Sequence, residues 1–365
     1  MLAQASTVWG IALLAAASAG CSKSGTFDSQ PLAAASTLAR TDVQPSTSEA
    51  INPQRNYVYC ATFELGWDEL RGQLGKQPVQ LQGDPGMARI LNDHPFDRSN
   101  IAPDDYLVVA GRTEQGIIAK IRAAMASRFP HASLEIPDPS PESNRYIIYA
   151  YLAKHLRFAQ EFDVMPGPFV FRADDGQAKV VAFEGHFESM NRQQKALRDQ
   201  VTILDYRNDN DFILRLNTTS KIDELILAKI SPAQSLRATI ETVQQRIQDS
   251  PATSSPQDGE HLIVPMISLA VERNYKELTN RRIENAQLPE TIIASARQDI
   301  RFCLDERGAR VESVSKITMT TSPSSEAPRR MFIFDRPFLL YMQQKGATAP
   351  YFAMWIANGE LLKRQ

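Results

Sequence analysis

The sequence lacks several features that would assign a function directly. It has only 3 cysteines in 365 residues, and no two of them stand at the spacing of a metal-binding pair. It contains no HExxH, no GxSxG, no Walker loop and no GxGxxG after a strand. Its 40 basic residues do not exceed its 42 acidic residues, which gives no reason to expect a nucleic-acid partner. We therefore predict that the protein is not an enzyme, binds no nucleic acid and needs no cofactor or metal.

The histidines are scattered and form no ligand pattern along the chain. The stretch HFE places His186 and Glu188 on one face of a strand, because side chains alternate with a period of two. Such a pair could be half of a metal or acid/base site, but a surface strand with outward polar residues is the simpler interpretation. The histidines are His94, His131, His155, His186 and His261.

One short apolar run stands near the N-terminus. VWGIALLAAASAGC, residues 8–21, is too short for a transmembrane helix and ends in small residues and Cys21. This pattern is typical of a bacterial signal peptide with a lipobox, and an ordinary secretory signal is the alternative. We predict a signal segment at residues 1–21, lipidation of Cys21, and a protein anchored by lipid to the bacterial membrane, in the periplasm or at the cell surface.

Two cysteines remain besides Cys21. Cys60 and Cys303 could form a disulfide in an oxidising compartment, but a single distant pair cannot be assigned from spacing. Two buried free thiols are the other interpretation. The sequence leaves both open.

Composition divides the rest of the chain into two parts. Residues 22–55 are rich in Ser, Thr, Ala and Pro and show no sustained apolar periodicity, which predicts a flexible tether. The chain is 43% hydrophobic, enough for a large core. We expect residues 56–365 to form a single domain.

Two helices and a larger number of strands are predicted in this domain. Thr113 is expected to cap a helix that ends at Pro130, and Ser231 to cap another that has Pro232 at its first position. Strands outnumber helices and do not alternate with them, which favours an α+β fold with mostly antiparallel sheets. The expected strands are DYLVVAG, HASLEIP, RYIIYAYLA, PFVFRA, VVAFEGHF, TILDY, DFILRLN, HLIVPMISLAV, IRFCLDE, MFIF, FLLYM and YFAMWIA.

The C-terminal part of the chain carries the most specific signal. It contains HLIVPMISLAVERNYKELTNRR, IRFCLDERGARVESVS, MFIFDRPFLLYM and APYFAMWIA, in that order. This run resembles the end of a serpin, in which a strand of the main sheet leads into an acidic hinge with a glycine, a long reactive loop, a Phe-x-x-Pro-Phe turn and a closing hairpin. The matching residues are Asp305, Glu306 and Gly308 in the hinge, and Phe334, Pro337 and Phe338 in the turn.

The resemblance implies a serpin-like α+β fold with a large, mostly antiparallel main sheet, C-terminal β-barrel-like sheets and surrounding helices. Only DPSPESN stands between HASLEIP and RYIIYAYLA, where a serpin has the helix that covers the main sheet, so we expect that helix to be missing. Gln298 stands where the family has a histidine eight residues before the hinge. Cys60 and Phe63 stand near the positions of two serines of the buried helix.

The family mechanism requires the reactive loop to enter the main sheet as a new strand after a protease has cut it. Alternate hinge residues would then point inward, and here this set is small or apolar, so no buried charge forbids insertion. The resemblance thus implies a monomeric inhibitor of serine or cysteine proteases. The residues it singles out are Glu306, Gly308, Ala309, Val311 and Ser313 in the hinge, and Met319, Thr321, Ser322 and Pro323 in the candidate scissile region.

Two other interpretations of the loop stay open. A non-inhibitory serpin-fold protein could use the same scaffold to bind a partner at the cell envelope. An exposed loop with no bait function is the simplest interpretation of the segment. The branched Val311 and Val314, together with Pro323 after the counted scissile position, favour these alternatives.

Overall fold

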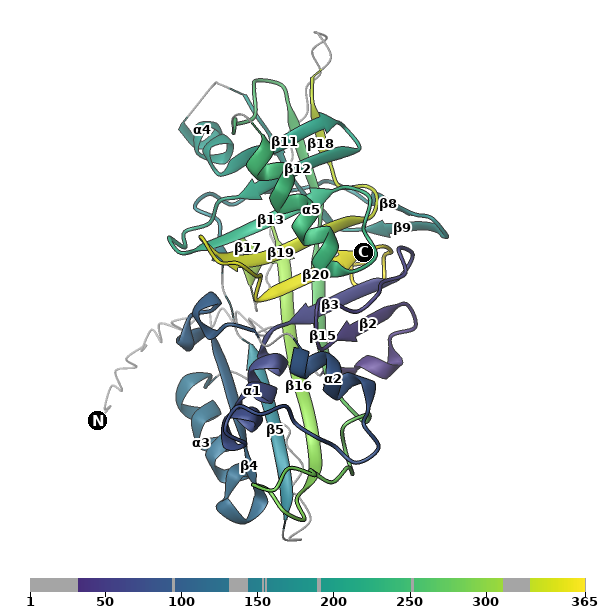
Figure 1. The fold of residues 1–365 in the computed structure, drawn as a ribbon. Coiled ribbons are helices and arrows are strands. Elements are labelled where there is room, and N and C mark those ends of the chain that lie inside the picture. Colours follow the sequence, from purple (N-terminus) through teal and green to yellow (C-terminus); the bar gives the residue numbers. More distant parts are fainter. Residues whose placement is uncertain are drawn as a thin grey trace, which may run out of the picture.

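The computed structural model describes residues 32–93, 96–130, 144–152, 154, 156–188, 192–250, 253–310 and 329–364. Within these ranges the chain forms three large sheets, a separate hairpin and surrounding helices (Figure 1). The helices are α1 (Thr62–Gln73), α2 (Gly86–Asp93), α3 (Ile117–Arg128), α4 (Arg192–Asp199) and α5 (Leu236–Asp249), with 3-10 turns η2 (Ala35–Thr37), η3 (Arg98–Asn100), η4 (Pro103–Asp105) and η5 (Thr113–Gln115). The strands are β1 (Ala33–Ala34), β2 (Thr41–Gln44), β3 (Asn56–Cys60), β4 (Tyr106–Arg112), β5 (Arg145–Leu152), β6 (Leu156–Arg157), β7 (Asp163–Val164), β8 (Phe169–Ala173), β9 (Gly176–Val180), β10 (Ala182–His186), β11 (Val201–Asn208), β12 (Asp211–Leu216), β13 (Asp223–Lys229), β14 (His261–Pro265), β15 (Ile267–Asn274), β16 (Ile292–Asp305), β17 (Gly308–Arg310), β18 (Met331–Ile333), β19 (Phe338–Gln344) and β20 (Phe352–Ile356).

The main sheet runs along the length of the molecule with the 14-residue strand β16 at its centre (Figure 1). β16 pairs antiparallel with β15 and parallel with β5, and β4 extends the sheet beyond β5. At the far end of β16, β17 and then β6 continue the sheet. The centre of the sheet is therefore the parallel pair β5–β16. Only at the end of β16 does an antiparallel strand, β17, lie between β16 and its neighbour β6.

Two further sheets lie at the upper end of the main sheet. One has the order β11-β12-β13-β19-β20-β3-β2, and its strands cross the direction of β16 (Figure 1). The other has the order β18-β14-β10-β7. Phe302 of β16 stacks on Phe352 of β20, with ring centroids 4.7 Å apart. Large buried side chains such as these join the sheets into one core.

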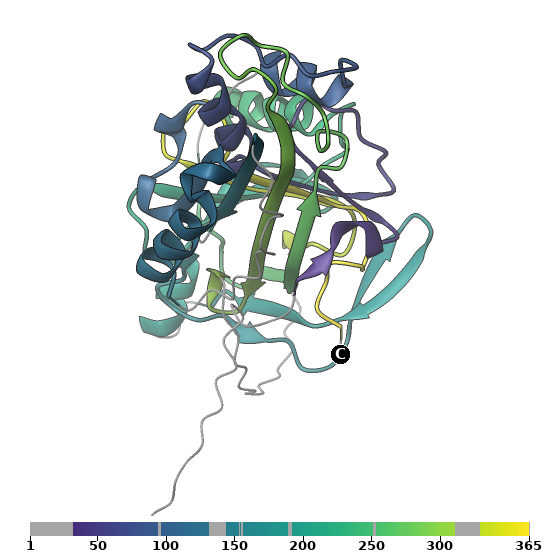
Figure 2. The ribbon, with the colours of Figure 1, turned by 90° about the horizontal axis from the view of Figure 1, so that it is seen from below.

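The run YIIYAYL of β5 is apolar throughout because both faces of the strand are covered. Tyr146 and Ile148 belong to the cluster beneath α1, whereas Ile147 and Tyr149 belong to the cluster beneath α3. Gly66 lets α1 approach the sheet, since a Cβ there would lie 2.7 Å from a methyl carbon of Ile148. The hairpin β8–β9 projects from the side of the molecule away from α3 (Figure 2).

The domain begins earlier than the composition predicts. β1 pairs with β15 and β2 pairs with β3, so the expectation of a flexible tether over residues 22–55 is wrong from Ala33 onward. Arg55 forms an ion pair with Asp42 at 2.8 Å. These contacts are long-range, and a Ser- and Pro-rich composition does not reveal them. Residues 1–31, including Cys21, lie outside the described residues.

The two predicted helices form, and the start of each is corrected. The expectation that Thr113 caps the first helix is wrong, because Thr113 begins the 3-10 turn η5 and α3 starts at Ile117 with Gly116 as its N-cap; α3 ends at Arg128, close to the predicted end at Pro130. α5 begins four residues later than expected, because its N-cap is Ser235 and not Ser231. The Ser235 hydroxyl accepts a hydrogen bond from the Ala238 amide at 3.1 Å.

The predicted strands form wherever the structure describes their residues. HLIVPMISLAV divides into β14 and β15, which belong to different sheets. HASLEIP lies outside the described residues, as do all of residues 131–143. The missing helix of the main sheet was expected in this same segment, so its absence stays a prediction.

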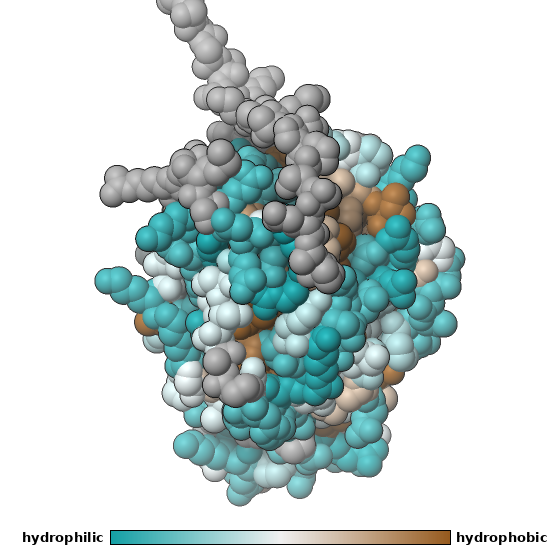
Figure 3. Space-filling model, turned by 90° about the horizontal axis from the view of Figure 1, so that it is seen from above, coloured by the Kyte–Doolittle hydropathy of each residue, from teal (hydrophilic) through white to brown (hydrophobic). Residues whose placement is uncertain are grey.

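The surface is mainly polar. The face seen from above is largely hydrophilic, with small and separate hydrophobic areas (Figure 3). Among the described residues, Ile222 is the one large hydrophobic side chain that is exposed, at 52%. No helix in the described ranges is long and apolar enough to cross a membrane.

Candidate functional site

The candidate hinge forms a tight hairpin at the end of β16. The chain turns after Asp305 and returns as β17, which pairs antiparallel with β16. On its other side β17 pairs antiparallel with β6, with Gly308 opposite Arg157 and Ala309 opposite Leu156. β17 is therefore a strand with a neighbour on each side.

The turn of this hairpin is held by both backbone and side-chain contacts. The Asp305 carboxylate accepts a hydrogen bond from the Arg307 amide at 2.9 Å. The carbonyl of Arg307 accepts from the Phe158 amide at 2.8 Å, and that of Glu306 accepts from the Phe162 amide at 2.9 Å. The guanidinium of Arg307 lies 3.1 Å from the buried Glu306 carboxylate. The hairpin is thus fixed against the segment that follows β6.

Gly308 is required by the space available to it. Its φ is +133°, a conformation that side chains disfavour. A Cβ built there would lie 2.0 Å from the carbonyl oxygen of Leu156 and 2.9 Å from the Cα of Arg157. Only glycine lets β17 approach β6 this closely.

The structure places part of the predicted hinge. Glu306 and Gly308 lie in the hairpin, and Ala309 points inward with 1% of its surface exposed. The other predicted residues, Val311 and Ser313 of the hinge and Met319, Thr321, Ser322 and Pro323 of the scissile region, lie outside the described residues.

Below the hinge the main sheet is closed. β5 and β16 pair in parallel from Arg145 opposite Ile292 to Leu152 opposite Ile300, with one irregularity near Ser295. A strand that continued β17 along β16 would have to separate this pair. The cost of separating β5 from β16 therefore controls any insertion.

A buried polar network lies beside this pair. The Gln298 side chain, on β16, donates from Nε2 to the carbonyl of Cys60 at 2.9 Å and to the hydroxyl of Thr62 at 2.8 Å. Its Oε1 accepts from the Tyr275 hydroxyl at 2.8 Å. All four residues are fully buried. Gln298 thus ties β16 to Cys60 and to the start of α1.

We expect Gln298→Leu to lower the free energy of unfolding by about 2 kcal/mol, because it leaves buried donors and acceptors without partners. Gln177 is exposed on β9, and Gln177→Leu makes the same chemical change without burial. That control should change stability by less than about 0.5 kcal/mol. Urea unfolding of both variants tests this, and equal stabilities would contradict the role given to Gln298.

Neither of the two remaining cysteines is part of a disulfide. Cys60 and Cys303 are both buried thiols, so the second of the two interpretations left open by the sequence holds. Burial raises the pKa of the Cys60 thiol to about 11, which keeps it protonated at neutral pH.

A buried acid on α1 makes stability depend on pH. The Glu64 carboxyl accepts a hydrogen bond from the Tyr59 hydroxyl at 2.9 Å, and burial raises the pKa of Glu64 to about 7. The native state therefore keeps a proton that the unfolded chain loses near pH 4.5. The stability that this bound proton gives the native state is fully present below pH 4.5 and is lost as the pH rises through 7. The free energy of unfolding should fall by about 3 kcal/mol over this range.

Glu64→Gln should therefore be more stable than the unchanged chain at pH 8 and close to it at pH 4.5. The glutamine side chain cannot ionise and still offers an oxygen to Tyr59. Unfolding by urea at a series of pH values between 4.5 and 8 measures the difference. The assignment is wrong if both proteins lose stability equally over this range.

Comparison with known proteins identifies the fold. No family model and no curated protein matches the sequence. Among solved structures, thyroxine-binding globulin in complex with thyroxine matches with a TM-score of 0.50 and 11% identity, covering 84% of this chain and 94% of that one. A highly specific serpin of the insect Tenebrio molitor matches with a TM-score of 0.48 and 12% identity, over 86% and 93% of the two chains.

The protein has the serpin fold. Its three sheets, the central parallel pair β5–β16 and the hairpin after β16 agree with this likeness. The expected serpin-like α+β fold is confirmed. At this level of identity the likeness establishes the fold alone.

Proposed function

We propose that the protein is an inhibitor of serine or cysteine proteases that acts by loop insertion. A target protease would cut within residues 311–328, and the freed segment would enter the main sheet between β5 and β16. The observation that carries this proposal is β17, since Gly308–Arg310 already form a strand beside the end of β16. Insertion would extend a strand that exists.

The register of β17 defines how far insertion could proceed. Ala309 pairs with Leu304, so in the same register Thr321 would pair with Ile292, the first residue of β16. A cut at Thr321 or Ser322 would therefore release enough chain to pair with the whole of β16. The segment from β17 to the candidate scissile region is thus long enough to pair with all of β16.

A protease panel tests the proposal. The purified chain is incubated with serine and cysteine proteases, and the products are separated on a denaturing gel. We expect a covalent complex that survives denaturation with at least one protease. Ser313→Arg should convert the protein from inhibitor to substrate, because Ser313 has the inward parity of Ala309 and insertion would bury the charge.

Ser313→Ala is the matched control for this substitution. It keeps position 313 small and uncharged, so insertion would bury no charge there. The variant should trap protease as well as the unchanged chain does. Equal trapping by Ser313→Arg and Ser313→Ala, or no trapping by the unchanged chain, would contradict the proposed mechanism.

A non-inhibitory binding function is the second candidate. It is favoured by the closed β5–β16 pair and by the buried Gln298 network, which both resist sheet opening. Thyroxine-binding globulin, a structure of similar fold, is solved with thyroxine bound. An open cleft of about 350 Å³, lined in part by Tyr59, Glu64, Arg237 and Gln244, offers space for a small ligand. Binding without any trapping of protease would support this candidate.

We also propose that the protein carries a lipid anchor. Cys21 would be lipidated after removal of the residues before it, and residues 22–32 would link it to the domain, placing a monomer at the bacterial membrane. Expression in bacteria with a labelled fatty acid tests this. Label should appear in the unchanged chain and be absent from Cys21→Ser, and label in both would contradict it.

A further inference from the structure

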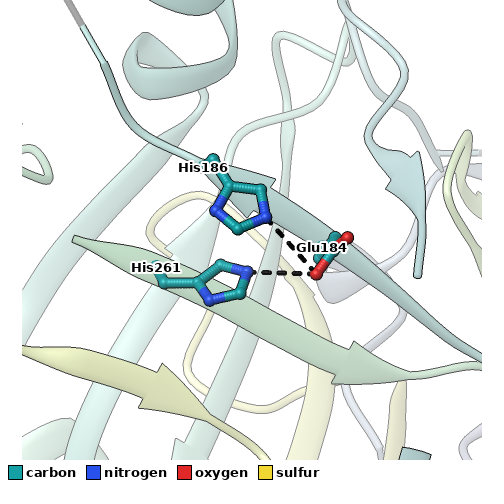
Figure 4. Close-up of side chains that lie close together, drawn as sticks. All are labelled: Glu184, His186 and His261. Atoms are coloured by element: carbon teal, nitrogen blue, oxygen red, sulfur yellow. Dashed lines mark hydrogen bonds and ion pairs between the residues drawn. The ribbon is translucent and has the colours of Figure 1, made fainter. Parts of the chain in front are cut away.

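Three side chains with metal-ligand chemistry converge on the sheet β18-β14-β10-β7. Glu184 and His186 are two residues apart on β10 and therefore share a face. His261, the first residue of β14, lies directly opposite His186 in the strand pairing. Figure 4 shows both imidazole rings turned toward the Glu184 carboxylate. The neighbouring Phe183 points the other way and is fully buried.

The donor atoms already have the spacing of metal ligands. The Glu184 Oε2 atom lies 3.5 Å from the Nε2 of His186 and 3.2 Å from the Nε2 of His261. Ligand atoms about 2.0–2.1 Å from a tetrahedral Zn²⁺ are separated by about 3.3 Å. The three donor atoms all lie within 4.8 Å of one another. The rings of His186 and His261 are stacked, with centroids 3.9 Å apart, so binding of one ion by both nitrogens requires the rings to turn relative to each other.

The environment suits a divalent cation. The side chains of Glu184 and His261 are only 12% and 15% exposed, whereas that of His186 is 52% exposed, so one side of the cluster opens to water. Asp163 of β7 lies opposite Glu184 in the strand pairing and therefore on the same face. Its charge and that of Glu184 together balance a doubly charged ion.

We propose that Glu184, His186 and His261 bind one Zn²⁺ ion. Two imidazole nitrogens and a carboxylate oxygen form a three-ligand set that zinc accepts, with the fourth position open to water or to a group of another molecule. The ion would join β10 to β14. Because His261 also lies opposite Met331 of β18, the site adjoins the strand that follows residues 311–328.

The experiment uses the full chain without an affinity tag, freed of metal by chelation. Zn²⁺ is titrated against a coloured chelator, and we expect one ion per chain. His186→Ala and Glu184→Gln should each weaken binding by at least about tenfold. His94→Ala removes an imidazole that belongs to neither β10 nor β14 and should leave the affinity unchanged. Binding of equal strength in all four proteins, or no binding by the unchanged chain, would overturn the proposal.

A second measurement reports the geometry of the site. Co²⁺ in place of Zn²⁺ should give the intense visible absorption of a four-coordinate ion in the unchanged chain, and lose it in Glu184→Gln. Circular dichroism checks that each variant is folded, and His186→Ala is expected to fold because that side chain is half exposed. A Co²⁺ spectrum that is the same in Glu184→Gln and in the unchanged chain would also overturn the assignment.

Discussion

Gly308→Ala is expected to destabilise the protein by about 3 kcal/mol or more. The added methyl would meet the Leu156 carbonyl at 2.0 Å, so β17 would have to leave its place beside β6. The clashing atoms belong to the backbone of Leu156 and Arg157, which cannot move aside as the end of a flexible side chain can. The strained φ of +133° adds to this cost. The free energy of unfolding in urea measures the effect.

Gly346→Ala is the matched control for Gly308→Ala. Gly346 also has a positive φ, of 77°, but a Cβ there would have nothing within 4 Å. Replacing Gly346 with alanine should cost only the free energy of holding a residue with a Cβ at positive φ, about 1 kcal/mol. If the two variants are equally stable, the close packing of β17 against β6 is not what holds the hinge.

The fold could be predicted from local patterns where those patterns decide the structure. The alternating and continuous apolar runs define strands such as β5, β12 and β16, and the spacing after Thr113 defines α3. The start of α5 could not be predicted, because Ser231 and Ser235 are both good caps. Ser235, the cap that forms, lies in an isolated bridge with Ala50, which is distant in sequence and cannot be read from the local pattern.

The N-terminal strands show the same limit. β2 has no apolar pattern of its own, and it forms because β3 offers a parallel edge and Arg55 pairs with Asp42. The composition of residues 22–55 is indeed polar and rich in serine. Composition alone cannot show that β2 pairs with β3, which is what orders this part of the chain.

Part of the candidate zinc site could be predicted from the sequence. His186 stands out in the HFE stretch, but its partner proved to be Glu184 on the same strand, not Glu188. The period of two would have given Glu184 as well. His261 could not be found this way, because only the pairing of β10 with β14 brings it beside His186.

Cutting the chain once within residues 311–328 is expected to raise the melting temperature by about 10 °C or more. The freed segment would separate β5 from β16 and pair with both, which replaces one strand interface with two. About 10 additional backbone hydrogen bonds at roughly 1 kcal/mol each would raise the melting temperature by about 20 °C, since each kcal/mol moves that of a large domain by about 2 °C, and the entropy lost by ordering the segment reduces this rise.

The melting temperature of the intact and the singly cut chain is the most direct test of the account. A protease is used briefly, a single cut within residues 311–328 is verified by mass, and both forms are heated under the same conditions. A large rise on cutting, absent in Ser313→Arg and retained in Ser313→Ala, is the predicted result. An unchanged or lower melting temperature of the cut chain would contradict insertion between β5 and β16.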